Sequence, residues 1–345
     1  MAAARVPVLI LGTLWPGHWD TLTRSRDTRP QACAVLAGTD IPVPAAFTGP
    51  ALEDLQRAAG GDTRLAAAAG APDGQVTQYL AGVPELMARY RNAPPTARAL
   101  IHAAMDARRL GHSLGLPHAL LEAAAPAYLT DTEWNGAGED WLEQALAWTA
   151  APCKGVAGPL TRIRPRPAAG PPEAGPPEAT GGPVYRLADY LDQHVRRHRS
   201  DTFPPDGFWS AARHCFPADQ ATLADAARAR GLYRHAAQLF KNATAHGDSN
   251  AATRLVDLMR SLHPGDHRAA RLAAAGVSLV DPGAVAVLLD SLREAGEEEQ
   301  VRVLVPRLPA AGMFDLFQQA AGRQFRFGYE PDASPAASWG WEDLY

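Results

Sequence analysis

The spacing of hydrophobic residues changes along the chain, from one short apolar run near the N-terminus to long stretches of helical period. The run Val8–Leu11 is continuous and ends at Gly12 and Thr13, which is typical of a strand buried on both faces of a parallel sheet. Gly38–Val43 is the one further extended candidate that follows. A parallel sheet needs neighbouring strands and crossover helices, and these are missing here. We therefore expect disorder or exposed apolar surface around Val6–Trp19.

From Pro50 onward, apolar residues recur at the spacing of helices. Four short helices are expected, beginning at Pro50, Asp62, Gln75 and Pro84. A longer helix is expected over 96–110 with Thr96 as its cap, followed by another over 117–125. Thr130–Glu133 has the form of an N-cap with an acidic first turn, which predicts a helical stretch continuing to Thr149.

Apolar and polar residues then alternate, which is the period of a half-buried strand. Gly158–Arg164 and Val184–Leu187 both follow this pattern and predict a β-hairpin. The segment between them, Arg166–Pro183, is rich in Pro, Gly and Ala, so we expect a disordered tip there. Three helices followed by a hairpin is the element order of a winged helix with an unusually long wing tip.

The C-terminal part contains an internal repeat of helical residues. At an offset of 33 residues, Leu255 matches Leu288 and Asp257 matches Asp290, and a weaker earlier copy contains Asp225. A glycine follows each copy: Gly231, Gly265 and Gly296. This period predicts helical hairpins like those of tetratricopeptide solenoids. The aromatic tail that contains Trp339 and Trp341 is expected to cap the last repeat.

Composition excludes several classes of protein. The net charge of −4 over 345 residues argues against a protein wrapped in nucleic acid. The two lysines, Lys154 and Lys241, do not lie in a Walker A context, so a phosphate loop is absent. The three cysteines are dispersed, which predicts reduced thiols. The N-terminal apolar run is too short for a bilayer and lacks a signal cleavage site, so we expect a cytoplasmic protein.

Arginines are concentrated around the predicted hairpin, and they are the candidate nucleic-acid contacts: Arg162, Arg164, Arg186, Arg196 and Arg197. The helix that would enter the major groove, around Glu139–Trp148, is acidic and aromatic. Nucleic acid is therefore not the expected partner. His194 and His198 have the spacing of metal ligands, but the two arginines between them would repel a cation, so no metal site is expected.

Five segments together resemble a bacterial branch of the STAND class of P-loop NTPases, which are signal-transduction ATPases related to AAA+ proteins. They are LGTLWP followed by Trp19, QYLAGVP over 78–84, AMDARRLGH over 104–112, LTRIRPRP over 160–167, and FRFG with WGWEDL over 325–344. The resemblance covers nearly the whole chain. It implies a sensor strand that ends at Thr13 near the γ-phosphate, and a helical lid whose Gly82 and Pro84 lie near the adenine.

The resemblance also implies the domains and the fold class. The fold is expected to be mainly α, with a strand left from an α/β NTPase domain, a helical lid, a winged helix and a solenoid of helical hairpins. The expected domains are a remnant of the NTPase domain over 1–48, the lid over 49–93, the winged helix over 94–199 with its disordered tip at 166–183, the repeats over 200–325 and the tail over 326–345.

Two functions remain open at this stage. The first is a regulatory and interaction protein, the arm of a nucleotide switch, whose repeats bind a protein partner. The Walker A and Walker B segments precede the sensor strand in the family, so this chain alone is expected to hydrolyse no ATP and hold no cofactor; ATP or ADP would bind only with an N-terminal NTPase segment. The chain would be a truncated gene product, a wrongly chosen start, or a subunit that pairs with a separate NTPase. The second is a DNA-binding regulator that uses the arginine-rich wing.

Overall fold

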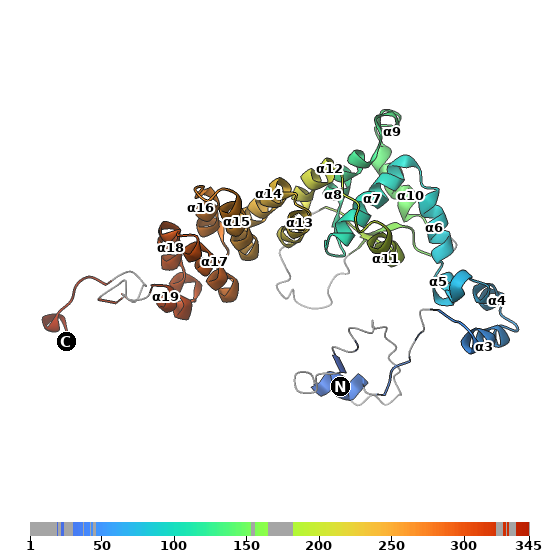
Figure 1. Cartoon of the computed structure of the whole chain (residues 1–345), viewed down its shortest axis with the longest axis horizontal. Helices are drawn as coiled ribbons and strands as arrows, with labels where there is room; N and C mark the ends of the chain where they lie inside the picture. Colours follow the sequence, from blue (N-terminus) through green and yellow to red (C-terminus); the bar gives the residue numbers. More distant parts are fainter. Residues whose placement is uncertain are drawn as a thin grey trace. The chain divides into compact units, whose positions relative to one another are not determined.

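The computed structural model describes residues 19, 22–23, 30–36, 38–41, 43, 46–152, 156–164, 182–321, 327–328, 330 and 336–344. Most of these residues are helical, which confirms the expected mainly α fold (Figure 1). The chain divides into two compact units that join between Ala81 and Gly82. None of the helices in these ranges is both long and apolar enough to cross a membrane. The predicted strand Val8–Leu11 and its Thr13 lie outside the described residues.

The first unit contains small helices whose starts and turns are set by local residues. They are α2 (Pro30–Leu36), α3 (Pro50–Ala58), α4 (Thr63–Ala69), the 3-10 turn η1 (Pro72–Gly74) and α5 (Val76–Leu80). The Asp62 carboxylate accepts the backbone N–H groups of Arg64 and Leu65, which caps α4. The described residues of Gly38–Val43 form no strand, so that prediction is wrong. A short extended segment without neighbouring strands has no partner for its backbone hydrogen bonds.

The second unit begins with helices arranged around a small sheet. Its first elements are α6 (Val83–Arg91), α7 (Pro95–Arg109), β1 (Leu116–Pro117), α8 (His118–Ala124), η2 (Ala125–Tyr128), α9 (Asp131–Asn135), α10 (Trp141–Ala150), β2 (Leu160–Ile163), β3 (Val184–Leu187) and α11 (Asp189–His198). The sheet is antiparallel with strand order β1-β3-β2, and Leu160 lies opposite Leu187. The predicted hairpin is therefore present. Most of its predicted disordered tip, Arg166–Pro183, lies outside the described residues.

Two local predictions in this region are wrong. The helical stretch from Thr130 to Thr149 is two helices, because the chain leaves the helix at Gly136 and begins again only at Trp141. Thr96 is not the cap of α7. The helix begins at Pro95, whose fixed φ suits a first helical position, and its cap residue Pro94 makes no side-chain hydrogen bond.

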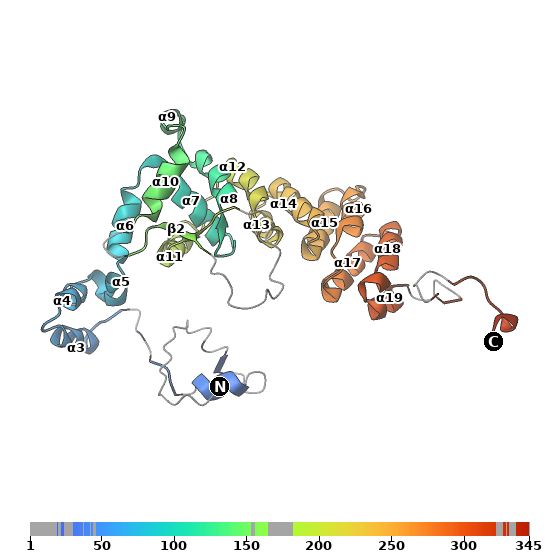
Figure 2. The same ribbon diagram turned by 180° about the vertical axis from the view of Figure 1, so that it is seen from behind.

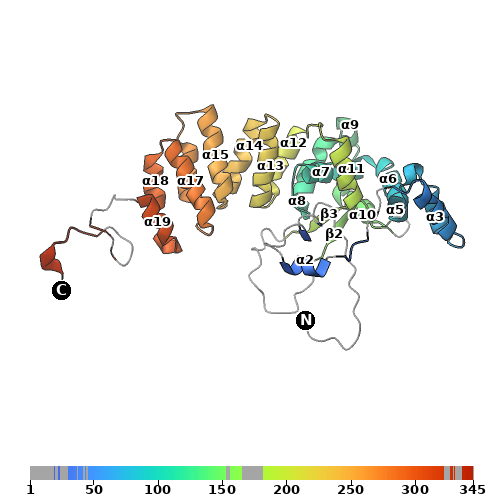
Figure 3. The same ribbon diagram turned by 60° about the horizontal axis from the view of Figure 1, so that its bottom comes forward.

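Helical hairpins follow to the end of the second unit. After α12 (Asp206–Ala211) and η3 (Ala212–His214) they are α13 (Pro217–Ala229), α14 (Tyr233–Ala245), α15 (Ser249–Leu262), α16 (Arg268–Gly276), α17 (Pro282–Glu294), α18 (Glu298–Leu304) and α19 (Phe314–Ala321), with the 3-10 turns η4 (Val305–Arg307) and η5 (Pro309–Ala311) before α19. Neighbouring helices in this series lie side by side (Figures 2 and 3). Gly231 and Gly296 have φ values of 74° and 73°. The turns between helices at these positions need a left-handed backbone conformation, which glycine adopts without strain.

Two hydrophobic clusters form the core of the second unit. The first extends without a break from Leu86 in α6 through Leu120 in α8 to Phe240 in α14 and Leu258 in α15. The second contains Leu288 and Phe317 and lies among α15–α19. The hydrophobic core therefore continues past the expected domain boundary at residue 199, because α8, α12, α13 and α14 share one cluster.

In the described part of the tail, the two tryptophans do not pack against the last helices as the expected cap would. Trp341 lies in the 3-10 turn η6 (Trp341–Asp343) and is 84% exposed, while Trp339 donates its indole N–H to the Phe327 carbonyl at 2.8 Å. These side chains therefore remain outside both hydrophobic clusters.

Candidate functional site

A buried carboxylate, Asp106 of α7, joins three segments of the second unit. It has no exposed surface, and its oxygens accept hydrogen bonds from Arg109 Nε at 2.7 Å and from the Tyr128 hydroxyl at 2.8 Å. Arg199, directly after α11, approaches the same carboxylate with Nη2 at 3.4 Å. Arg109 in turn donates to the carbonyls of Ser200 and Thr202. We call Asp106, Arg109, Tyr128 and Arg199 the Asp106 cluster.

The surroundings of the Asp106 cluster fix its charge states. Burial and the adjacent carboxylate both raise the pKa of Tyr128 well above its ordinary value, so its hydroxyl stays protonated and donates. Two arginines balance the single carboxylate, and the side chain of Arg109 is only 2% exposed. A buried charge that is paired and hydrogen-bonded is tolerated, whereas removal of one partner leaves an uncompensated charge. The cluster therefore holds α7, η2 and the end of α11 in one arrangement.

A chain of aromatic and histidine side chains connects the cluster to α6. The Tyr90 hydroxyl lies 2.9 Å from His102 Nε2, and the His102 ring packs edge-on against Tyr128 at 6.1 Å between centroids. Burial, with a smaller contribution from Arg199, lowers the pKa of His102 to about 4, so the ring is neutral at pH 7. Hence the position of α6 is linked through Tyr90 and His102 to the side chain that bonds Asp106.

A second contact holds α6 against α10. The Arg89 guanidinium lies over the Trp148 ring at 4.2 Å from its centroid and donates through Nη2 to the Trp148 carbonyl at 2.5 Å. In a winged helix, α10 would be the helix that enters DNA. Here its C-terminal end contacts α6.

Polar contacts also join α7 to α11 and to α13. Arg108 donates through Nε and Nη2 to Oδ2 of Asp192, at 3.2 and 2.8 Å. Beyond the end of α7, Ser113 donates its backbone N–H and its hydroxyl to the Asp219 carboxylate of α13, at 2.7 and 3.0 Å. Burial lowers the pKa of the neighbouring His112, against the opposing effect of Asp219. The cluster thus lies on a continuous path from α6 to α13.

The residues proposed to bind nucleotide are only partly described. Gly82 caps α6 with a φ of 76°, and a side chain built on it would meet Val156 Cγ2 at 2.1 Å. Pro84 is an exposed residue of the first turn of α6. Thr13 is outside the described residues, so the structure does not place it beside the other two.

The hairpin arginines do not form one surface. Arg162 lies opposite Tyr185 in the strand register and Arg186 lies opposite Thr161, so the two arginines point to opposite faces of the hairpin. Arg186 pairs with Asp189, and Arg196 pairs with Asp192, both at 2.9 Å. Arg162, Arg164 and Arg197 are exposed and form no ion pair within the described ranges.

The two histidines at metal-ligand spacing stack on each other, with 4.2 Å between the ring centroids of His194 and His198. The Nδ1 atom of His198 lies 2.9 Å from the His194 carbonyl oxygen. Across the described residues, no group of three or more candidate ligands could hold a metal ion.

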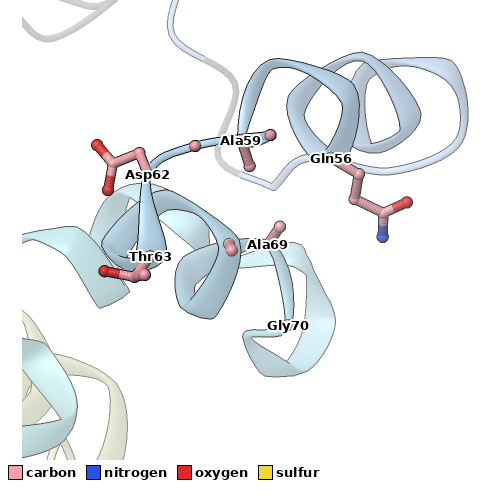
Figure 4. A pocket seen from close by; sticks show the side chains of 9 residues that line it. Gln56, Ala59, Asp62, Thr63, Ala69 and Gly70 are labelled. Atoms are coloured by element: carbon pink, nitrogen blue, oxygen red, sulfur yellow. The ribbon is translucent and has the colours of Figure 1, made fainter.

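The first unit contains an open pocket of about 560 Å³ between the end of α3 and α4 (Figure 4). Its lining is mostly glycine and alanine, with Gln56, Asp62 and Thr63 as the polar side chains. Asp62 already caps α4, and the lining contains no basic residue. The pocket thus lacks the cation that a phosphate group requires.

Sequence reasoning singled out the segment 104–112 but gave Asp106 no role. The available signal was an acid between Met105 and Ala107 on the apolar stripe of a strong helix, with Arg109 three residues later. A carboxylate on the buried side of a helix is removed from water, and a buried charge needs hydrogen-bond or ion-pair partners. The partners Tyr128 and Arg199 are distant in sequence and could not be inferred.

Known proteins add no constraint to this geometry. Comparison of the chain with protein-family models, with curated proteins and with solved structures found no match.

Proposed function

We propose that this chain is a regulatory and protein-interaction protein of the STAND type, in which helical repeats bind a protein partner and a winged helix connects them to a helical lid. The strand order β1-β3-β2, with β1 between α7 and α8 and the hairpin β2–β3 after α10, supports the winged helix. The paired helices α13–α18 and the positive φ of Gly231 and Gly296 support hairpin repeats of tetratricopeptide type.

The Asp106 cluster is the observation that carries this proposal. Its polar bonds join α7, η2 and the end of α11 and are costly to break singly, and the bond between Tyr90 and His102 connects α6 to the same group. Occupancy of the repeats would then be communicated to α6 through α7. If an N-terminal NTPase segment is present, ATP or ADP would bind with its adenine near Gly82 and Pro84. Alone, the chain is proposed to act by binding, without hydrolysis and in the cytoplasm.

The test is capture of a partner by the full chain, followed by measurement with purified components. Val287 on α17 is 57% exposed and Val303 on α18 is 46% exposed. The first helices of the hairpins are proposed to form the binding face. Val287→Asp should therefore weaken partner binding at least tenfold, while Val303→Asp leaves it unchanged. Equal retention of the partner by wild type and Val287→Asp would contradict this assignment, and absence of any specifically retained protein would contradict the proposed function.

A DNA-binding regulator is the second candidate, because Arg162 and Arg164 are exposed without an acidic partner in the described chain. The acidic residues at the start of α10 and the contact of α6 with Trp148 weigh against it. If DNA binds, its affinity should fall steeply with salt, and Arg162→Ala should reduce the dependence on salt. Weak affinity with a flat salt response would remove this candidate.

A further inference from the structure

An exposed tryptophan pair with surrounding carboxylates lies at the junction of α9 and α10. Trp134 and Trp141 pack edge-on, with 5.6 Å between ring centroids, and Trp134 is 42% exposed. The capping box of Thr130 and Glu133 fixes the short helix α9 that carries Trp134. The exposed carboxylates on the same segment are Asp131, Glu139, Asp140 and Glu143. We call these four residues and the two tryptophans the tryptophan patch.

The carboxylates of the tryptophan patch form no ion pair with any residue that the structure describes. The segment 131–143 contains five acidic residues and no basic one. Its single ion pair within the described chain is that of Glu133 with Arg98 at 3.1 Å, and Glu133 lies outside the patch as defined. Asp140 accepts a hydrogen bond from the Gln144 amide at 2.7 Å. An exposed aromatic face beside uncompensated carboxylates attracts guanidinium groups, through the charge and through cation–π contact.

A positively charged surface lies on the hairpin β2–β3 of the same unit. Arg162 and Arg164 are exposed without an ion pair in the described ranges, and Ile163 between them is 38% exposed. Arg162 and Ile163 belong to β2, which is at an edge of the sheet, and Arg164 directly follows it. Figure 3 shows α9 on one side of this body and the hairpin β2–β3 on the other. No ion pair joins the two surfaces in the described chain, although the elements that carry them, α10 and β2, contribute to the same hydrophobic cluster.

We infer that the tryptophan patch binds the hairpin arginines, Arg162 and Arg164, of a second copy of this chain. The contact is head-to-tail, since it uses two different surfaces, and such contacts form rings or open chains. The charged surfaces are small and lie at the periphery of the fold, so the association is expected to be weak and sensitive to salt. This inference does not depend on the partner proposed for the repeats.

Charge reversal with mixing tests the contact directly, in sedimentation velocity of the full chain at about 50 and 300 mM salt. Wild type should associate with rising concentration at low salt and dissociate at high salt. Arg162→Glu with Arg164→Glu should abolish association, and so should Glu139→Arg with Asp140→Arg. An equimolar mixture of these two variants should associate again, because the acidic hairpin of one then meets the basic patch of the other.

Matched controls separate this contact from general effects of charge. Arg57→Glu with Arg302→Glu changes the net charge by the same amount as Arg162→Glu with Arg164→Glu, but at exposed residues far from both surfaces in sequence. This control should associate as wild type does. Trp134→Ala should weaken association at least tenfold without unfolding the chain. The inference is overturned if wild type stays monomeric at all concentrations, if the mixture fails to associate, or if duplex DNA binds the hairpin arginines of a chain that does not self-associate.

Discussion

Tyr128 donates its hydroxyl to the buried carboxylate of Asp106 at 2.8 Å, and thereby joins the turn after α8 to the middle of α7. The same tyrosine ring contacts His102, which in turn is hydrogen-bonded to Tyr90 of α6. The carboxylate of Asp106 is thus bonded to side chains from α7, η2 and the end of α11, and α6 is connected to it through His102 and Tyr128.

Removal of the negative charge at Asp106 should destabilise the protein strongly. Asp106→Asn leaves the side chain of Arg109, which is 2% exposed, without its counter-ion, and loss of one partner of a buried pair costs about 3–5 kcal/mol. Urea unfolding measures the change. Asp315→Asn, at an exposed position of α19, should change the free energy of unfolding by less than about 0.5 kcal/mol. A loss below about 1 kcal/mol at Asp106 would contradict a buried charged cluster.

His102 should make stability depend on pH. Its pKa is about 4 in the folded chain and about 6.5 in the unfolded chain, so protons bind the unfolded state more readily between these values. The contribution is complete above pH 6.5 and is lost as pH falls toward 4, by up to about 3 kcal/mol. The variant His102→Phe keeps an aromatic ring but cannot bind a proton. Unfolding curves at pH 7, 5.5 and 4 should therefore show a smaller loss in the variant; parallel curves would refute a neutral, buried His102.

Gly82 should tolerate no side chain. Its φ of 76° is unfavourable for alanine, and the added Cβ would meet Val156 Cγ2 at 2.1 Å. Gly231→Ala is the matched control, because Gly231 has a φ of 74° with nothing within 4 Å of the added atom. The control should cost about 1 kcal/mol from the backbone alone. Gly82→Ala should cost more, and Val156→Ala should recover part of the difference; equal costs at the two glycines would contradict the contact.

The contact between Arg89 and Trp148 should carry a measurable coupling energy. A double-mutant cycle of Arg89→Met and Trp148→Leu isolates the interaction from the loss of each side chain. A cation over an indole ring predicts a coupling of about 1 kcal/mol, whereas the hydrogen bond of Arg89 to the Trp148 backbone carbonyl persists in Trp148→Leu and does not enter the coupling. Additive effects of the two substitutions would show that the contact between the Arg89 guanidinium and the Trp148 ring does not stabilise the packing of α6 against α10.

Local features of the fold could be predicted where neighbouring residues determine them. The capping role of Thr130 and Glu133, the hairpin strands and the turns at Gly231 and Gly296 depend on residues within a few positions of each other. The two-residue strand β1 could not be predicted, because Leu116 and Pro117 are too few to show a period and depend on pairing with β3. Helix α2 and the gap between α9 and α10 were also missed.

The candidate site was less accessible from sequence than the fold. The arginine-rich hairpin suggested one basic surface, but strand register separates Arg162 from Arg186, and Asp189 and Asp192 pair with two of the five arginines. The Asp106 cluster joins residues up to 93 positions apart, and such contacts follow from tertiary packing alone. The helical period of apolar residues indicates which side of α7 is buried. It does not indicate which side chains form hydrogen bonds with Asp106 on that side.

The central claim is that α6, the elements from α7 to α11 and the helix α13 form one cooperative unit through Asp106. Native-state hydrogen exchange of the full chain, compared between wild type and Asp106→Asn, tests it most directly. We predict that amides of α6, α11 and α13 lose protection together with those of α7, by a similar free energy. Loss of protection confined to α7 and η2, with α6 and α13 unchanged, would contradict the claim.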